Sequence, residues 1–191
     1  MDVILNRDQR ITAAFAGDLF QEHAAACAAA RENAMRPVAA PFDVVVTTNS
    51  GYPLDQNLYQ AVKGMSAAAK IVKPGGAIIC AAECRDGIPD HGAYRQILAS
   101  KSSPRELLDM ITTPGYSRAD QWQVQIQAQI QIKARVLVRS DCLSDEQVRA
   151  AHLEPVKDIS AAVNENLLRA GPHATLCVLP NGPQTIPYLE F

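Results

Sequence analysis

Four runs of consecutive apolar residues recur along the chain, and segments with helical spacing separate them. The runs lie within residues 42–50 (FDVVVTTNS), 75–83 (GGAIICAAE), 134–140 (ARVLVRS) and 174–180 (ATLCVLP). Strands that are apolar at every position are typical of parallel sheets whose two faces are both covered. We therefore predict an α/β fold with an open, mainly parallel sheet and helices on both faces.

The connecting segments carry helix signals. Ser144, with Gln147 three residues later, has the spacing of a capping box, and Gly171 ends the last helical segment. Residues 37–41 (PVAAP) are interpreted as a connector. The predicted helices are residues 56–72, 94–100, 104–111, 144–152 and 158–171.

A small element precedes the predicted sheet. Residues 3–16 are interpreted as an N-terminal β-hairpin with a polar Asn-Arg-Asp turn, closed by Gly17. A hairpin this small is marginal by itself and must lean on another part of a protein. A helix is predicted over residues 18–35, with Asp18 as its N-cap and a narrow apolar face of Phe20, Ala24, Cys27 and Ala28.

Residues 121–134 (QWQVQIQAQIQIKA) present a conflict between two rules. Gln alternates strictly with apolar residues, which is the period of a strand. However, a strand that continued into residues 134–140 would exceed the usual length of about 3–10 residues, and Gln and Ala favour helix. We predict a helix that is contacted from two sides, with Trp122, Ile126 and Ile130 on one side and Val124, Ala128 and Ile132 nearly opposite.

Length and composition narrow the class of protein. The chain has 191 residues, 48% hydrophobic and 20% charged, and a formal net charge of -2. This length suits a single domain over residues 1–191, and the charge lacks the basic footprint of a nucleic-acid-binding protein. No apolar run approaches the ~20 residues that span a bilayer, and the N-terminus lacks the cationic start of a signal peptide, so we expect a cytoplasmic protein. The five cysteines are interpreted as reduced structural thiols: Cys27, Cys80, Cys84, Cys142 and Cys177.

Two polar loops follow the first two predicted strands of the sheet. They are residues 47–56 (TTNSGYPLDQ) and 81–92 (AAECRDGIPDHG). In the first loop, Gly51 permits a tight turn and Pro53 stiffens the exit. Because ligands bind beyond the carboxyl ends of parallel strands, these loops are the first candidates for a binding site.

The helix after the first loop carries polar side chains along one edge. Tyr59 and Lys63 are four residues apart on one face, with Gln60 about 100° round the axis and Gln56 one turn earlier. A lysine and an amide together suit a carboxylate, because one supplies a charge and the other a directed hydrogen bond. The same spacing is also that of a solvated helix surface, and the pattern leaves both interpretations open. The opposite side of this helix is apolar: Leu58, Ala61, Val62 and Met65.

The second loop concentrates charged residues that suit either acid–base chemistry or a salt-bridged turn. The four histidines of the chain show no ligand spacing of the H-x-x-x-H type, so we predict no self-contained metal site. The sequence also lacks glycine-rich nucleotide loops and the G-x-S-x-G elbow. The charged residues of this loop are Glu83, Arg85, Asp86, Asp90 and His91.

Residues 51–79 (GYPLDQNLYQAVKGMSAAAKIVKPGGAII) resemble the C-terminal domain of the nickel-dependent lactate racemases. The run is long and specific, and other segments also match that family. These are residues 11–23 (ITAAFAGDLFQEH), 81–91 (AAECRDGIPDH), 120–122 (DQW) and 185–187 (TIP). The resemblance therefore extends over nearly the whole chain.

The resemblance implies that the chain is part of a two-domain isomerase that interconverts the enantiomers of lactate or related 2-hydroxy acids. Enzymes of this family use a nickel pincer built on a pyridinium mononucleotide, which takes hydride from the substrate Cα while a histidine base removes the hydroxyl proton. The lysine and histidines that serve this cofactor belong to the family's N-terminal domain, which has no counterpart in these 191 residues. We therefore expect the chain to be inactive alone and its partner domain to be encoded upstream or in an adjacent reading frame.

The resemblance implies that this chain forms the C-terminal side of the cleft between the two domains of the family. Tyr59, Gln60 and Lys63 match the family's Tyr-Gln-x-x-Lys positions, and Trp122 matches an aromatic residue that lines the same cleft. The resemblance implies that Lys63 and Gln60 act as catalytic residues that contact the substrate carboxylate or the charged groups of the cofactor. Tyr59 and Trp122 would shape the pocket. A further motif matches without an assigned role: Glu83, Arg85, Asp86 and His91.

Two other hypotheses remain open at this point. The chain could be a non-catalytic module that binds a small carboxylate or a nucleotide, which predicts stabilisation of the isolated chain by that ligand. Alternatively, an exposed apolar surface could pair with a second copy of the chain to form a homodimer. The hairpin would then pair with a sheet of the neighbouring copy.

Overall fold

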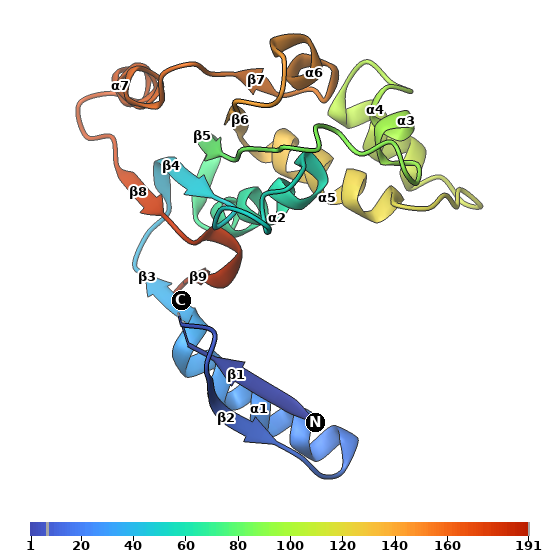
Figure 1. Ribbon diagram of the computed structural model, residues 1–191. Helices are drawn as coiled ribbons and strands as arrows, with labels where there is room; N and C mark the ends of the chain where they lie inside the picture. The colour runs from blue at the N-terminus through green and yellow to red at the C-terminus, as the bar shows by residue number, and fades with distance from the viewer. Residues whose placement is uncertain (7, 191) are drawn as a thin grey trace. The chain divides into compact units, whose positions relative to one another are not determined.

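The computed structural model describes residues 1–6 and 8–190. The chain divides into two compact units, Met1–Arg36 and Pro37–Phe191 (Figure 1). The hairpin belongs to the first unit and the parallel sheet to the second. Arg7, in the predicted turn of the hairpin, lies outside the described residues.

The first unit consists of a hairpin and one helix, as predicted. Strand β1 (Asp2–Leu5) pairs antiparallel with β2 (Ile11–Phe15), and α1 (Leu19–Ala34) contacts both strands. Asp18 caps α1 because its carboxylate accepts hydrogen bonds from two backbone N–H groups of the first turn, at 3.1 and 3.2 Å.

The apolar face predicted for α1 is wrong. Glu22 and Ala26 are the buried residues of this helix. An alanine-rich helix has no strong apolar stripe to select one side, and here an ion pair contributes: the Glu22 carboxylate lies 3.3 Å from the N-terminal ammonium group. The residues of the predicted face are exposed: Phe20, Ala24, Cys27 and Ala28.

The second unit is built on a five-stranded sheet in which all neighbouring strands are parallel. The strand order is β7 (Glu154–Pro155), β6 (Arg135–Arg139), β5 (Val72–Ala81), β4 (Phe42–Thr48) and β8 (Leu176–Leu179). The four apolar runs of the sequence are β4, β5, β6 and β8, so the prediction of an open parallel sheet is confirmed. The two-residue strand β7 carried no sequence signal.

Helices cover both faces of this sheet, also as predicted (Figure 1). On one face, α2 (Leu58–Ala69) and α5 (Gln121–Lys133) pack over Val45 and Ile78 in the larger core. On the other face, α7 (Ile159–Ala170) covers a smaller cluster that includes Val44, Ile79 and Leu137. The remaining helices are α3 (Tyr94–Leu98), α4 (Pro104–Ile111) and α6 (Asp145–Ala150), and α6 has the predicted capping box of Ser144 and Gln147.

Strand β8 was predicted to be buried, and it is instead an edge strand. Leu176 is 40% exposed and Val178 is 57% exposed, so that only Leu179 of this strand is buried. An apolar run has the same pattern at the edge of a sheet as in its interior, because the sequence does not show how many neighbours a strand has.

The interpretation of residues 37–41 as a connector needs a correction as well. Strand β3 (Met35–Val38) reaches into this segment and pairs with β9 (Ile186–Leu189) in a separate two-stranded sheet, and Glu190 N donates to Val38 O at 3.2 Å. Both strands are short and contain a proline, which weakens any strand signal. A 3-10 turn, η1 (Gly182–Gln184), precedes β9.

Helix α5 confirms the choice of helix for residues 121–134. Gln123 and Gln127 are one turn apart and almost fully buried. Their side-chain amides donate to the backbone carbonyls of Tyr59 (2.6 Å) and Ala151 (2.8 Å) respectively. A buried amide needs such partners, and the helical spacing aims both amides at the same side.

Three backbone segments meet closely where β4 ends. A Cβ placed on Gly64 of α2 would lie 2.3 Å from the Thr48 carbonyl oxygen, and one placed on Gly182 of η1 would lie 2.4 Å from the same oxygen and 3.0 Å from the Gly64 Cα. Side chains do not fit at such distances. Glycine at both positions therefore permits α2 and η1 to approach the end of β4.

We expect Gly64→Ala to lower the free energy of unfolding by about 1–3 kcal/mol, although alanine normally gains ~1 kcal/mol over glycine inside a helix. The reason is that the new methyl group must displace the backbone of β4. Urea unfolding followed by circular dichroism measures the change. Ser66→Ala, at a half-buried position of the same helix, is the control and should leave stability unchanged or slightly raised. Equal stability of Gly64→Ala and the wild type would contradict the prediction.

One carboxylate links strands at the end of the sheet away from the two polar loops. Asp43 of β4 accepts hydrogen bonds from Lys73 Nζ of β5 at 2.8 and 2.9 Å and from the backbone N and Oγ1 of Thr175, next to β8, both at 2.8 Å. The Lys73 hydrogen bond, followed by those from Thr175, lowers the pKa of Asp43 from 3.8 to about 2.

Asp43→Asn should lower the free energy of unfolding by about 1–2 kcal/mol at pH 7. The folded-state pKa lies below the unfolded one, so this stabilisation is present above about pH 4 and is lost as the pH falls towards about 2. Denaturant unfolding at several pH values should show the gap to the wild type closing over that interval. Asp109→Asn, on the exposed side of α4, should show no comparable gap. A difference that persists unchanged at pH 2 would show that the ionised carboxylate is not its source.

Candidate functional site

The two polar loops beyond the carboxyl ends of β4 and β5 are joined by backbone hydrogen bonds. Cys84 N donates to Asp55 O at 3.0 Å, and Leu58 N donates to Gly87 O at 3.0 Å. The first loop makes the tight turn expected at Gly51, whose φ is +73°. Together the loops fix the point at which α2 begins.

Two asparagines that the sequence analysis did not single out anchor the start of α2. The buried Asn49 accepts a hydrogen bond from Gly64 N at 2.9 Å through Oδ1, and its amide donates to Leu54 O. Asn57 is the N-cap of α2, where its Oδ1 accepts from Gln60 N at 3.1 Å. An asparagine directly before a helical segment is a recognisable cap signal, whereas the role of Asn49 depends on the tertiary fold.

The polar edge predicted for α2 exists in the structure. Lys63 is exposed and Gln60 is half-buried, and Lys63 Nζ donates to Gln60 Oε1 at 2.6 Å. The residues predicted for the opposite side of the helix are all fully buried: Leu58, Ala61, Val62 and Met65.

Three aromatic rings pack next to this polar edge of α2. The half-buried Tyr59 ring lies edge-on between Tyr94, at 5.2 Å between centroids, and Trp122, at 5.7 Å. Trp122 itself is 51% exposed and therefore offers most of one ring surface to a ligand. Tyr94 is fully buried, where its hydroxyl donates to Gln127 Oε1, and burial raises the pKa of this hydroxyl strongly.

The predicted residues line two neighbouring hollows. The larger groove, of about 300 Å³, is lined by Lys63, Ser66 and Lys70 of α2, Trp122 of α5, and Pro183 and Thr185 of the C-terminal segment. A smaller hollow, of about 160 Å³, is lined by Asn57, Tyr59, Gln60, Pro89, His91 and Asp120. The Lys63–Gln60 hydrogen bond and the Tyr59–Trp122 contact connect the two.

Asp120 is a site residue that helical spacing could not reveal. It precedes α5 in a left-handed conformation (φ +64°), and its Oδ2 accepts from Ala93 N at 3.1 Å. Gly92 makes room for this carboxylate, because a Cβ there would lie 2.0 Å from Asp120 Oδ2. Burial, and secondly the negative charge of Asp120, raise the pKa of Tyr59.

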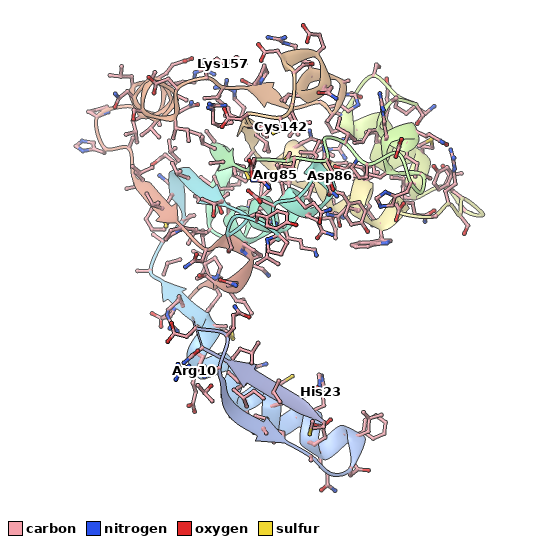
Figure 2. The ribbon with its side chains drawn as sticks, viewed as in Figure 1. Arg10, His23, Arg85, Asp86, Cys142 and Lys157 are labelled. Carbon is pink, nitrogen blue, oxygen red and sulfur yellow. The ribbon has the colours of Figure 1, made fainter. Side chains whose placement is uncertain are left out.

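The charged residues of the second loop divide between structure and site. The Arg85 guanidinium lies 3.1 Å from the Glu83 carboxylate and 5.1 Å from the centre of the Tyr52 ring. Asp86 accepts from Gln56 Nε2, and Figure 2 shows Arg85 and Asp86 close together on this loop. Glu83, Arg85 and Asp86 therefore hold the loops in shape, whereas His91 reaches the smaller hollow.

Within residues 1–6 and 8–190, no three His, Cys, Asp or Glu side chains lie close enough together to hold a metal ion. All five cysteines are free, and burial raises the pKa of the Cys84 thiol to about 12, which keeps it protonated at neutral pH. In this described part of the chain, no helix is both long and apolar enough to span a bilayer.

Comparisons with known proteins agree with the resemblance found in residues 51–79. Residues 38–186 match the family model of the lactate racemase C-terminal domain. A lactate racemase from Lactiplantibacillus plantarum is 39% identical over 184 residues, and one from Thermoanaerobacterium thermosaccharolyticum is 37% identical over 188 residues. These matches cover 95% and 97% of this chain but 43% and 44% of the two relatives, so the chain spans less than half of their length.

Solved structures give the same result. The structure of the lactate racemase apoprotein from Thermoanaerobacterium thermosaccharolyticum superposes with a TM-score of 0.88 at 37% identity, over 97% of this chain and 44% of that one. A Thermotoga maritima protein of 12% identity has a TM-score of 0.55 over 90% of this chain and 42% of its own, and shares the fold alone.

Asp120→Asn should lower the pKa of Tyr59 towards its ordinary value, because it removes the nearby negative charge while an amide oxygen can still accept from Ala93 N. An NMR pH titration of the chain, labelled with ¹³C-tyrosine, measures this pKa. Glu83→Gln, which neutralises a carboxylate paired with Arg85 instead, is the control and should leave the Tyr59 titration in place. An unchanged pKa in Asp120→Asn would mean that the carboxylate does not act on the phenol.

Proposed function

The chain belongs to the lactate racemase C-terminal domain family, and on this basis we propose that it is the C-terminal part of a lactate or other 2-hydroxy-acid racemase. In this proposal it forms one wall of the active-site cleft and is inactive alone. The observation that carries the proposal is the hydrogen-bonded pair of Lys63 and Gln60, in which Lys63 lines the larger groove and Gln60 lines the smaller hollow.

Lys63 and Gln60 suit the carboxylate of a 2-hydroxy acid. Lys63 supplies the positive charge that attracts the anion. Because Gln60 Oε1 accepts from Lys63 Nζ, the Gln60 amide is oriented with its Nε2 donors turned away from the lysine, where they can reach an oxygen of the ligand. The pair would fix the substrate carboxylate and so hold the carbon next to it in one place.

Tyr59 and Trp122 would shape the pocket around this anchor. The two rings pack edge to face, which restricts their rotation, and Tyr59 is held from behind by Tyr94. A rigid aromatic surface excludes water from the apolar side of a bound ligand and strengthens the nearby ionic contact. Burial, and secondly the Asp120 carboxylate, raise the pKa of the Tyr59 hydroxyl, so this protonated hydroxyl would act there as a hydrogen-bond donor.

The nickel pincer pyridinium mononucleotide expected from the family would contact this chain, but the residues described here would not ligate its metal. No group of three metal-ligating side chains occurs among the residues that the structure describes, so we propose that the metal and its tether are held by the N-terminal part of the enzyme. Lys63, Gln60 and the exposed ring of Trp122 would face the charged and planar portions of the cofactor. When bound, the cofactor supplies the acceptor for the hydrogen that leaves the substrate α-carbon.

A second function is favoured by the groove itself. Its walls, including Lys63, Lys70, Trp122 and Thr185, all come from the second unit of this chain. The isolated chain could therefore act as a module that binds a small carboxylate or nucleotide without catalysis. That function predicts that lactate or a nucleotide raises the melting temperature of the isolated chain, while no racemisation is gained on adding any partner.

The test mixes this chain with the separately expressed N-terminal part of the Thermoanaerobacterium racemase, matured with its cofactor, and measures interconversion of L- and D-lactate by chiral chromatography. We expect activity only in the mixture. Lys63→Ala should lower kcat/KM by about 10- to 100-fold, because the charged contact to the substrate carboxylate is lost. L-lactate binding to the complex, measured by calorimetry, should weaken in parallel.

Lys101→Ala, which removes an exposed lysine outside both hollows, is the matched control and should keep full activity. An inactive mixture in which the two parts demonstrably bind each other would contradict the proposal of a lactate racemase. Ligand stabilisation of the isolated chain under the same conditions would then support the binding module.

A further inference from the structure

The first unit has an apolar surface that its described residues leave exposed. In the hairpin, Val3 is 42% exposed, Leu5 is 48% exposed and Ile11 is 64% exposed. We call these three residues the hairpin face. Exposed apolar residues are common singly, but three neighbouring ones on a short hairpin are characteristic of a contact surface.

The strand register places these residues together. Leu5 pairs directly with Ile11 across the hairpin, and Val3 lies two residues before Leu5 on the same side of β1. The residues of alternate positions, Ile4 and its partner Ala13, are half-buried. One side of the hairpin is therefore partly covered by α1, and the other side is equally apolar but open. A hairpin with apolar residues on both sides is a middle layer of a larger fold.

Among residues 1–6 and 8–36, only Glu22 and Ala26 are buried, so the described part of the first unit has almost no core of its own. The buried residues of α1 are one acid and one alanine, Glu22 and Ala26, and a two-stranded hairpin is marginally stable in water. At the start of α1, Leu19 is 68% exposed and Phe20 is 80% exposed. A helix that turns its largest apolar residues outwards and buries a carboxylate is missing the structure against which those residues pack.

The comparisons indicate where that structure lies. The lactate racemase C-terminal domain begins at residue 38, after the first unit has ended at Arg36. The two relatives nevertheless match 95% and 97% of this chain, so about ten residues at most are unmatched and most of the first unit has a counterpart in them. In those proteins the counterpart precedes the C-terminal domain, next to the more than half of the sequence that this chain does not span.

We propose that the hairpin face is the surface by which this chain docks onto the N-terminal part of a lactate racemase. In this assignment the first unit belongs structurally to the N-terminal part, whose apolar side chains cover Val3, Leu5 and Ile11, and the second unit presents Lys63 and Gln60 to the cleft. The inference rests on the proposed function for the identity of the partner, and on the apolar hairpin face for the position of the contact.

The test measures binding of the 191-residue chain to the separately expressed N-terminal part of the Thermoanaerobacterium racemase by calorimetry. The double variant Val3→Lys/Leu5→Lys should weaken binding by about 30-fold or more, because it would bury two ammonium groups in an apolar contact. Val3→Thr/Leu5→Thr keeps strand propensity and should weaken binding by roughly 5-fold or more. Leu168→Lys changes an equally large residue on α7 that is 83% exposed and should bind as the wild type does.

We expect the variants to fold, because all the changed side chains are already solvent-exposed. Circular dichroism and urea unfolding of the free variants check this. Unchanged affinity in both hairpin variants would overturn the proposal, and so would a wild-type chain that does not bind the N-terminal part. Self-association of the wild-type chain that is lost in the hairpin variants, with no binding to the N-terminal part, would instead identify a second copy as the occupant.

The docking proposal and the proposed function fail in different ways. Lys63→Ala should lower the racemase activity of the complex whatever its effect on affinity, because Lys63 belongs to the proposed site and not to the hairpin face. If binding depends on Val3 and Leu5 but the complex does not racemise lactate, the docking surface stands and the proposed function is wrong. If the complex is active but its affinity is unaffected by the hairpin variants, the docking surface is wrong and the function stands.

Discussion

The close approach of three backbone segments at the end of β4 is the contact on which the geometry of the second unit depends. Gly64 and Gly182 bring α2 and η1 against the Thr48 carbonyl oxygen. The helix that carries Lys63 is thereby held close to the end of β4, and η1 is placed where Pro183 and Thr185 line the groove together with α2. The candidate site is thus positioned by backbone contacts, and its own polar side chains remain free for a ligand.

The framework around the site is held largely by neutral amides. Asn49 and Asn57 anchor the first turns of α2, and Gln123 and Gln127 attach α5 to the carbonyls of Tyr59 and Ala151. Amides can be buried with much less desolvation cost than charges, provided that each finds a partner. In the groove itself, positive charge is available to a ligand at Lys63 and Lys70. Because side-chain amides do not titrate, these four hydrogen-bonded contacts do not depend on pH in the range where carboxylates and lysines stay ionised.

The sequence predicted the parts of the fold that follow from periodicity. Continuous apolar runs located β4, β5, β6 and β8 because a parallel sheet covered by helices buries both faces of most strands. The same pattern did not show that β8 lies at the edge, and the short strands β3, β7 and β9 carried no signal. In the site, Tyr59, Gln60 and Lys63 followed from helical spacing, and Trp122 from a resemblance. Asp120, Asn49 and Thr185 contribute through contacts between distant segments, which spacing along the chain does not record.

The segment of residues 180–186 joins two fixed points. Gly182 is packed against the sheet, and β9 is paired with β3. Residues between these points, Pro183 and Thr185, line the groove together with α2, whereas α2 cannot shift without displacing β4. In the proposed function, α2 would therefore recognise the carboxylate, and residues 180–186 would accommodate the rest of the substrate. If that division holds, insertions or exchanges in this segment would change the size of acid accepted while Lys63 and Gln60 stay in place.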